Sequence, residues 1–274
     1  MHDYSEFADL ELAGWSDGAT AKAYAEGFAS ASALHVPHLV RAVEAGPGSR
    51  ALDLCCGHGI IAEQLVEAGA ETTGLDFSPA MLRLARDRVG KANFVEGDAG
   101  DLPLEDDSFD AVTIGLGMPH VPDPAAVARE VHRVLRRGGR LAFTVWCGVE
   151  RSLAWRAVFG SIATHGDPEV KMPPAPDANA LSEKVATQAL LQGAGFDDVD
   201  VEILDSYWDV DDPSRLFDYF YEGTVRGGAL LRQQPSDYSE AIRSAIADVV
   251  VSELGPDGPW RVPVPAAMTS ATAV

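Results

Sequence analysis

The chain has 274 residues, of which 46% are hydrophobic and 23% charged, a composition typical of an ordinary globular protein with a large core. Its 42 acidic residues against 21 basic ones give a formal charge of -21, and both halves of the chain are acidic. This excess repels phosphate groups, so the sequence disfavours nucleic-acid partners and anionic membrane surfaces.

The first residues, Met1 to Glu6, contain neither a basic nor an apolar leader, and no run approaches the ~18 apolar residues of a membrane span. We therefore expect a cytoplasmic protein without a membrane partner, acting as a monomer or a homodimer. Of the three cysteines, Cys55 and Cys56 are adjacent and cannot form an ordinary disulfide. No spacing of Cys and His residues indicates a zinc site, so no metal is expected.

From about residue 50, short apolar runs alternate with amphipathic stretches, which is typical of an α/β protein with a mainly parallel sheet covered on both faces. Six such runs predict strands, and a further apolar run at the C-terminus predicts a seventh, antiparallel strand. The predicted strands are 50–54, 71–75, 93–97, 110–115, 140–146, 199–210 and 260–274.

The intervening helices carry clear boundary signals. Apolar residues between 61 and 68 follow helical spacing, and Gly69 is placed to end that helix. Ser78 as N-cap and Pro79 at the first position begin the next helix. Pro124 begins a helix through Leu135 that Gly138 and Gly139 are expected to close. A fourth helix is predicted over 182–192.

Three segments fall outside this pattern and predict a helical cap on a single domain spanning residues 1–274. The cap segments are 1–43, 150–180 and 211–255, and the core is about 44–149, 181–210 and 256–274. Because the cap segments join the sheet at the edge where parallel strands bind ligands, they are candidates for a mobile cover.

The turn after the first strand reads Gly57-His58-Gly59-Ile60-Ile61-Ala62, which satisfies the glycine pattern of nucleotide-binding turns. Asp53, Asp76 and Asp98 follow three successive strands, and no Lys or Arg lies in those turns. A pyrophosphate would meet an unfavourable potential there, whereas a sulfonium and an ammonium would be attracted. S-adenosyl-L-methionine therefore fits this edge better than NAD does.

Four stretches together resemble class I S-adenosylmethionine-dependent methyltransferases of the ubiquinone/menaquinone-biosynthesis type (methyltransferase type 11). They are Ala51–Gly59, Gly74–Leu82, Glu96–Asp110 and Val134–Leu141. The resemblance covers residues 45–146 strongly and 181–201 loosely. It implies a Rossmann-like, doubly wound sheet of seven strands that binds S-adenosyl-L-methionine and methylates a small organic molecule.

The resemblance also implies roles for particular residues. The turn of Cys55, Gly57 and Gly59 would hold the methionine part of the cofactor, with Asp53 near its ammonium and Gly115 lining the same end. Asp76 would accept hydrogen bonds from the ribose hydroxyls, and Asp98 with the Ala99 backbone would bind the adenine. Phe77 and Met81 would flank the adenine. Trp15 and Tyr24 would belong to an N-terminal lid that closes the site. Cys55 stands where the family usually has glycine.

His120, in the loop after the fourth strand, is the candidate general base, because histidine titrates near neutral pH. An alternative is that His120 only orders the loop. The aromatic residues of the cap present a similar choice between enclosing an apolar acceptor and ordinary packing of helices on the sheet.

The sequence thus predicts O- or C-methylation of a biosynthetic intermediate, quinone-like or secondary-metabolite-like. One alternative is a relative that binds S-adenosyl-L-methionine but catalyses a non-methylating reaction such as a cyclisation. Another is a nucleotide-binding oxidoreductase.

Overall fold

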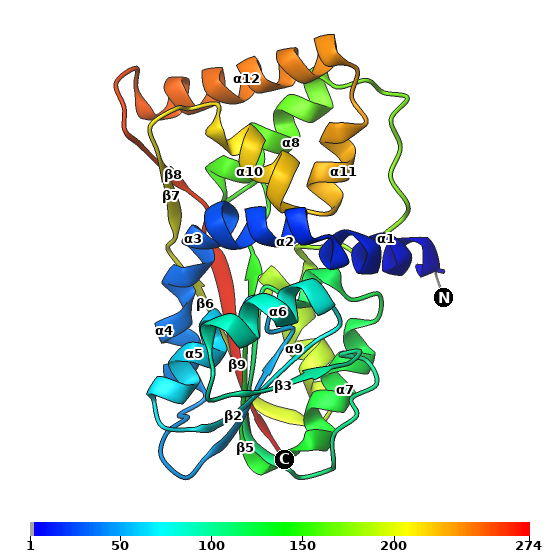
Figure 1. Cartoon of the computed structure of the whole chain (residues 1–274), viewed down its shortest axis with the longest axis vertical. Coiled ribbons are helices and arrows are strands. Elements are labelled where there is room, and N and C mark those ends of the chain that lie inside the picture. The colour runs from blue at the N-terminus through cyan, green and yellow to red at the C-terminus, as the bar shows by residue number, and fades with distance from the viewer. Residues whose placement is uncertain (1–2) are drawn as a thin grey trace.

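The computed structural model describes residues 3–274. A large sheet flanked by helices forms the lower part of the molecule in Figure 1, and a group of helices forms the upper part. The N-terminal helices α1 (Ser5–Ser16) and α2 (Gly18–Ala23) lie between them. Within residues 3–274, no helix combines the length and the apolarity that crossing a bilayer requires.

The large sheet has seven strands in the order β3-β2-β1-β4-β5-β9-β6, and β9 alone runs antiparallel to its neighbours. This confirms the predicted α/β class and the antiparallel last strand. The seven strands are β1 (Arg50–Leu54), β2 (Glu71–Asp76), β3 (Asn93–Glu96), β4 (Phe109–Gly115), β5 (Leu135–Trp146), β6 (Phe196–Leu204) and β9 (Ala266–Ala273).

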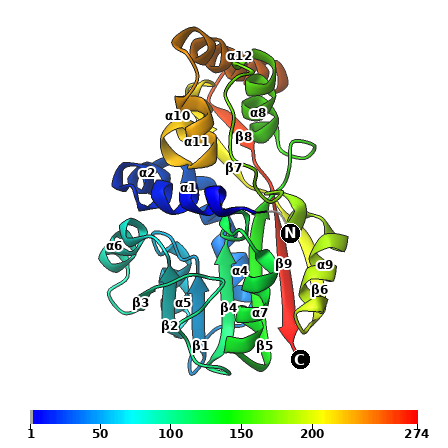
Figure 2. The same ribbon diagram turned by 90° about the vertical axis from the view of Figure 1, so that its right-hand side faces the viewer.

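Successive side chains of the central strands point to opposite faces of the sheet. They belong to two hydrophobic clusters, one on each face. The small residues Ala51, Ala111 and Ala142 lie in the cluster that packs against α4 (Val36–Ala42) and α5 (Ile60–Glu67). Larger neighbours such as Leu52, Val112 and Phe143 lie in the other cluster, with α7 and α9. Figure 2 shows the helices on the two sides of the sheet. The remaining helices beside the sheet are α6 (Pro79–Arg88), η3 (Met118–His120), α7 (Pro124–Val134), η4 (Ala180–Ser182) and α9 (Lys184–Gly193).

Two predicted strands are each divided in the structure. The run predicted over 199–210 gives β6 and then β7 (Tyr207–Val210), and the run over 260–274 gives β8 (Trp260–Pro263) and then β9. β7 and β8 pair with each other in a separate two-stranded sheet. Proline lacks the backbone N–H that a ladder needs, so Pro263 and Pro265 end the first pairing and let the chain turn into the large sheet.

The helix that begins at Pro124 ends at Val134, and Gly138 and Gly139 lie inside β5 rather than closing the helix. A Cβ on Gly139 would lie 2.8 Å from the Arg136 carbonyl oxygen and 3.2 Å from that of Asp110. The glycines therefore allow a tight irregularity within the strand, where the register against β4 shifts.

The upper part contains β7, β8 and a core of packed aromatic rings. Trp208 is fully buried, and its ring centroid lies 4.9 Å from that of Phe28 and 6.2 Å from those of Trp146 and Phe220. These cap aromatics thus pack largely on one another, and not simply as helices against the large sheet. The helices of this part are α8 (Leu153–His165), α10 (Arg215–Gly223), α11 (Arg226–Arg232) and α12 (Ser236–Leu254).

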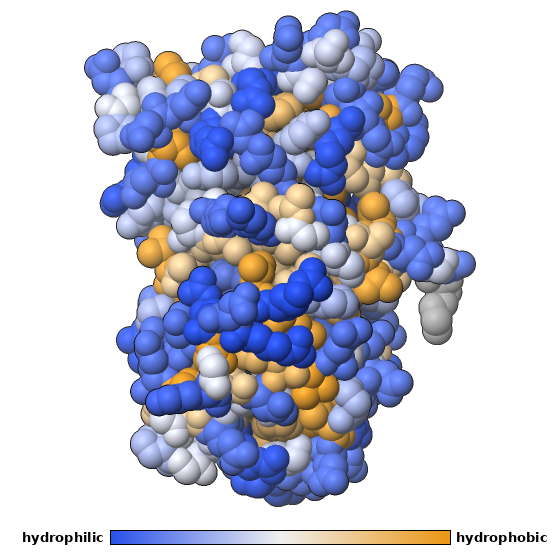
Figure 3. Space-filling model, in the orientation of Figure 1, coloured by the Kyte–Doolittle hydropathy of each residue, from blue (hydrophilic) through white to orange (hydrophobic). Residues whose placement is uncertain are grey.

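The N-terminal segment joins the upper and lower parts. After α2 the chain continues through a π-helical turn, η1 (Tyr24–Phe28), then α3 (Ala29–Ser32), the 3-10 turn η2 (Ala33–His35) and α4. Its beginning lies under the upper helices, whereas α4 packs against β4 and β5. Polar side chains cover most of one face of the molecule, interrupted by apolar patches near the level of α1 and α2 (Figure 3). The proposed division of one domain into core and cap stays a prediction.

Candidate active site

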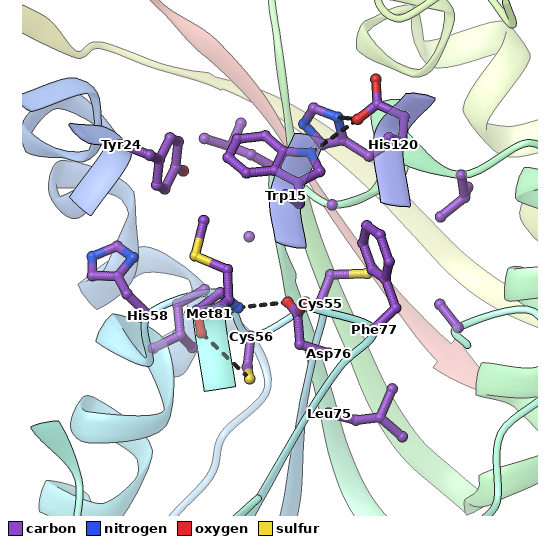
Figure 4. Close-up of a pocket in the computed structure, with 18 of the residues that line it drawn as sticks. Trp15, Tyr24, Cys55, Cys56, His58, Leu75, Asp76, Phe77, Met81 and His120 are labelled. Atoms are coloured by element: carbon purple, nitrogen blue, oxygen red, sulfur yellow. Dashed lines mark hydrogen bonds and ion pairs between the residues drawn. The ribbon is translucent and has the colours of Figure 1, made fainter. Parts of the chain in front are cut away.

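A cavity of ≈ 340 Å³ lies at the carboxyl edge of the parallel strands. The ends of β1, β2 and β4 and the loops after them form its floor, and α1 and η1 close it from the other side. In Figure 4, Trp15 and Tyr24 face Asp76, Phe77 and Met81 across this space. Open α/β sheets bind ligands at this edge, because the strand ends leave a crevice there.

The glycine turn forms one wall of the cavity. Cys55 and Gly57 both have a positive φ, of 55° and 53°, and the Gly57 N–H donates to Asp76 Oδ2 at 2.8 Å. The turn is thereby fixed to the end of the neighbouring strand β2. Because Gly57 has no side chain, the backbone of the turn itself faces the cavity.

Cys55 adopts this left-handed backbone although it has a Cβ, which costs about 1–3 kcal/mol for a residue other than glycine. Its side chain packs against Gly117, where an added Cβ would lie only 2.5 Å from Cys55 Cβ. The missing side chain at Gly117 thus leaves room for the cysteine at a position where the resembled family usually has glycine. Burial raises the pKa of the Cys55 thiol well above its ordinary value, which disfavours the nucleophilic thiolate.

Asp76 ends β2 and lines the cavity with a buried carboxylate. Its two oxygens accept one backbone N–H each, from Gly57 and from Ser78, both at 2.8 Å. Burial raises the pKa of Asp76 to about 6, and these two hydrogen bonds oppose the shift. Each oxygen can accept a further hydrogen bond, so Asp76 presents acceptors to a ligand.

Asp53 lies beneath the cavity and is not among the residues that line it. Its carboxylate accepts from the Ala62 N–H at 2.9 Å and from the Thr113 hydroxyl at 3.2 Å. Gly59, the N-cap of α5, has no side chain to cap this helix, so Asp53 supplies the acceptor from β1. Burial raises the pKa of Asp53 to about 7. Gly59 likewise lies outside the lining, next to Ala85 of α6.

The start of α6 forms the opposite end of the cavity. The Ser78 hydroxyl accepts from the Met81 N–H at 3.0 Å, which confirms the predicted N-cap, and it donates to the Trp15 carbonyl at 2.6 Å. Phe77 and Met81 line the cavity and also contact the cluster around Trp15. The exposed Asp98 and the buried Ala99 complete this end.

Aromatic side chains from the N-terminal segment cover the cavity. The ring centroids of Trp15 and Tyr24 lie 5.3 Å apart, with the planes nearly perpendicular. Tyr24 also lies edge-on to His58, at 5.7 Å, and burial lowers the pKa of His58 to about 4. His58 is therefore neutral at physiological pH and contributes an uncharged side chain to the cavity.

His120 lies at the end of η3 and lines the cavity beside Trp15, with ring centroids 5.2 Å apart. Its Nδ1 lies 2.9 Å from Glu11 Oε2. The same carboxylate oxygen accepts from the Trp15 indole N–H, also at 2.9 Å. α1 thus places a buried acid, Glu11, in contact with His120. Among the described lining residues, His120 is the only histidine that follows β4.

Residues 52–143 match the family model of a methyltransferase domain. The matched residues run from β1 to β5. Over 110 residues the chain is 43% identical to the demethylmenaquinone methyltransferase of Staphylococcus haemolyticus, covering 38% of this chain and 46% of that one. Over 104 residues it is 44% identical to the corresponding enzyme of Listeria welshimeri, covering 35% and 44%. The chain thus spans less than half the length of these curated relatives.

Solved structures share the fold at low sequence identity. The YcgJ protein of Bacillus subtilis is 19% identical with a TM-score of 0.57, covering 87% of this chain and 97% of that one. Phosphoethanolamine N-methyltransferase 2 of Haemonchus contortus, solved with S-adenosyl-L-methionine, is 18% identical with a TM-score of 0.58. That alignment covers 97% of this chain and 60% of the other.

The fold brings nearly all of the predicted site residues to one cavity. All of them line it except Asp53 and Gly59; those that do are Trp15, Tyr24, Cys55, Gly57, Asp76, Phe77, Met81, Asp98, Ala99, Gly115 and His120. Their roles toward a ligand stay predictions.

Sequence reasoning missed Glu11 and the inner lining from α3 and α4. Glu11 is one of 42 acidic residues, and nothing in its local sequence indicates burial. Ser32, Val36 and Leu39 lie on helices that read as an ordinary alanine-rich cap segment. The helical spacing around Glu11 would place residues 7, 11 and 15 on one face, and Phe7 and Trp15 on that face were a weak signal that the acid between them is buried.

Proposed function

We propose that this methyltransferase domain binds S-adenosyl-L-methionine and transfers its methyl group to a small organic acceptor. The observation that carries the proposal is the charge of the cavity. Its described lining includes the acids Asp9, Glu11, Asp76 and Asp98, and no Lys or Arg. A net-cationic cofactor with a sulfonium is attracted to such a lining, whereas the pyrophosphate of a dinucleotide is repelled. The same observation disfavours the oxidoreductase alternative.

Separate groups of lining residues suit the ribose, the adenine and the methionine part of this cofactor. The open oxygens of Asp76 suit two ribose hydroxyls, and Asp98 with the Ala99 N–H suits the adenine edge. Phe77 and Met81 would flank the adenine ring. The turn at Cys55 and Gly57, with Gly115, would hold the methionine part. Asp53, which does not line the cavity, would attract the ammonium group electrostatically.

When bound, S-adenosyl-L-methionine supplies a methyl carbon made electrophilic by its sulfonium. The tasks left to the chain are to align the acceptor, exclude water and remove a proton where the acceptor requires it. Trp15 and Tyr24 exclude water by covering the cavity. His120 is the group on the acceptor side that can take a proton.

For the acceptor, we propose a quinone-like or related biosynthetic intermediate methylated on oxygen or carbon. The names of the relatives, demethylmenaquinone methyltransferases, support this class, and the mainly apolar lining suits an aromatic molecule. Formation of S-adenosylhomocysteine with a panel of aromatic hydroxyl compounds separates this proposal from a non-methylating role such as a cyclisation.

Asp76→Ala is the test of the cofactor site. We expect it to weaken S-adenosyl-L-methionine binding by about 1–3 kcal/mol, because the ribose hydroxyls lose their buried acceptor. Isothermal titration calorimetry measures this change, with Asp87→Ala, an exposed acid on α6 outside the cavity lining, as the matched control. Equal affinity in the two variants would exclude Asp76 from the binding site.

Cofactor affinity should also depend on pH. Because the pKa of Asp76 is raised to about 6, its carboxyl is protonated below that pH and becomes an anion as pH rises through it. The anion attracts the cationic cofactor, so we expect the association constant to rise by about tenfold between pH 5 and pH 8, the limit for one linked proton being tenfold per pH unit. Calorimetry at both pH values measures the rise.

Two controls isolate this carboxylate. Asp76→Asn removes the titrating group and should flatten the profile. S-adenosylhomocysteine lacks the sulfonium charge and should show a smaller rise in the wild-type protein. A profile that is equally steep in Asp76→Asn would assign the pH dependence to another group.

A further inference from the structure

Glu11 is an acid buried in the helix that covers the cavity, and only 2% of its surface is exposed. Its Oε2 receives two nitrogen contacts at 2.9 Å, from the Trp15 indole and from His120 Nδ1. Its Oε1 has no hydrogen-bond partner among residues 3–274. Burying an acid costs free energy of folding unless hydrogen bonds or charges compensate it. The contacts of Glu11 with Trp15 and His120 are therefore candidates for a functional role.

These contacts favour one tautomer of His120. The indole N–H can only donate, so Glu11 Oε2 accepts that bond. That oxygen's remaining lone pair suits a second donor, so the 2.9 Å contact favours a hydrogen on His120 Nδ1. In a neutral imidazole the other nitrogen, Nε2, is then left as an acceptor.

A positive group on α11 interacts electrostatically with Glu11. The Arg226 guanidinium of α11 is partly buried, and one of its nitrogens, Nη1, has no partner among the described residues. Burial lowers the pKa of Arg226, and the charge of Glu11 opposes this shift. The guanidinium thus places a positive charge on α11 within electrostatic reach of Glu11 on α1.

We propose that Glu11 is a positioning residue that holds His120 with Nδ1 protonated and Nε2 free, so that the site methylates acceptors through an aromatic or enolic hydroxyl. This inference rests on the proposed function and narrows its acceptor class. As the acceptor oxygen forms its bond to the methyl carbon, the hydroxyl proton passes to His120 Nε2. The carbon–sulfur bond breaks with its electron pair remaining on sulfur, and Glu11 neutralises the resulting imidazolium.

The arrangement also couples the base to the cover of the cavity. Glu11 and Trp15 belong to α1, and the carbonyl of Trp15 is held by the Ser78 hydroxyl at the start of α6. His120 belongs to a loop of the sheet. The base is therefore oriented only while α1 lies over the cavity and excludes water from it.

The first test reads the tautomer of His120 directly and needs no acceptor. Long-range ¹H–¹⁵N NMR of the full chain identifies the protonated ring nitrogen, with His120→Gln used to assign the signal. We expect Nδ1–H in the wild-type protein and in Glu11→Gln, whose amide oxygen still accepts both bonds. Glu11→Ala should shift the ring toward Nε2–H, whereas Glu6→Ala, an exposed acid on the same helix, should not. Nε2–H in the wild type, or Nδ1–H unchanged in Glu11→Ala, would overturn the proposal.

The second test separates positioning of a base from a structural role. 2-Naphthol needs a base, whereas the more acidic 2-naphthalenethiol is already ionised at pH 8 and needs none. Glu11→Gln should lower kcat for the naphthol by about tenfold, with KM within twofold, and leave the rate with the thiol unchanged. Equal losses with both probes would show that Glu11 acts only through the structure of α1.

Failure of the proposed function would look different. A wild-type protein that does not bind S-adenosyl-L-methionine in calorimetry would contradict the methyltransferase proposal, while the NMR result would still decide whether Glu11 sets the tautomer of His120.

Discussion

His120→Ala should lower kcat by about 10²–10⁴, the contribution typical of a positioned general base. The residue lines the cavity, and it is not among the groups proposed to bind the ribose or the adenine. Cofactor affinity should therefore stay within about twofold of the wild-type value. Steady-state rates with a hydroxyl acceptor, together with calorimetry, measure both quantities.

Two further measurements determine the role of His120. Measured at saturating S-adenosyl-L-methionine, so that the titration of Asp76 does not limit binding, the pH–rate profile of the variant should lose the acidic limb that a general base produces. His165→Ala, which removes an exposed histidine at the end of α8, should leave the rate unchanged. A His120→Ala variant that retains most of its activity would mean that acceptor alignment supplies the acceleration. Joint loss of cofactor binding and activity would assign His120 to ordering the loop after β4.

Trp208→Ala should lower the free energy of unfolding by about 3–5 kcal/mol, the range for truncating a buried aromatic residue. Trp208 is fully buried, and its indole N–H donates to the Phe28 carbonyl at 2.9 Å. Phe28 and the cavity residue Tyr24 are the two ends of the same π-helical turn η1. Loss of Trp208 should therefore also loosen the cover of the cavity and weaken cofactor binding.

Urea denaturation followed by circular dichroism measures this loss of stability. Trp208→Phe is the matched control, since it keeps most of the ring packing and removes the hydrogen bond, which contributes about 0.5–1.5 kcal/mol. A loss below about 1 kcal/mol in Trp208→Ala would mean that the aromatic core collapses around the gap. In that case η1 does not depend on the upper part of the molecule.

The sheet could be predicted because its signals are local. The apolar runs and the turns between them depend on neighbours a few residues apart, and so do Ser78 at the start of α6 and the glycine turn after β1. Since parallel strands place their carboxyl ends at one edge, the positions of Asp76 and Asp98 followed from the strand pattern alone. The sequence resemblance added roles that the pattern does not contain.

Strand boundaries depended on contacts that no local signal contains. Tyr207–Val210 and Trp260–Pro263 have strand character, but which sheet they join is decided by their pairing with each other. Asp53 was correctly expected at the end of β1, yet its carboxylate points to the start of α5, because the N-cap Gly59 has no side chain and leaves backbone donors without an acceptor.

The sequence by itself determined the α/β class, the antiparallel last strand, the acidic edge of the sheet and the glycine turn, because periodicity, turn chemistry and charge are properties of neighbouring residues. Only the tertiary structure decided that Glu11 contacts His120, residues separated by more than one hundred positions. Burial of Glu11 matters as well, because a carboxylate competes with water for its hydrogen-bond donors unless packing excludes water. Here one oxygen of Glu11 contacts both Trp15 and His120. That contact requires α1 to lie across the strand ends, and the packing of α1 against α6 determines this placement.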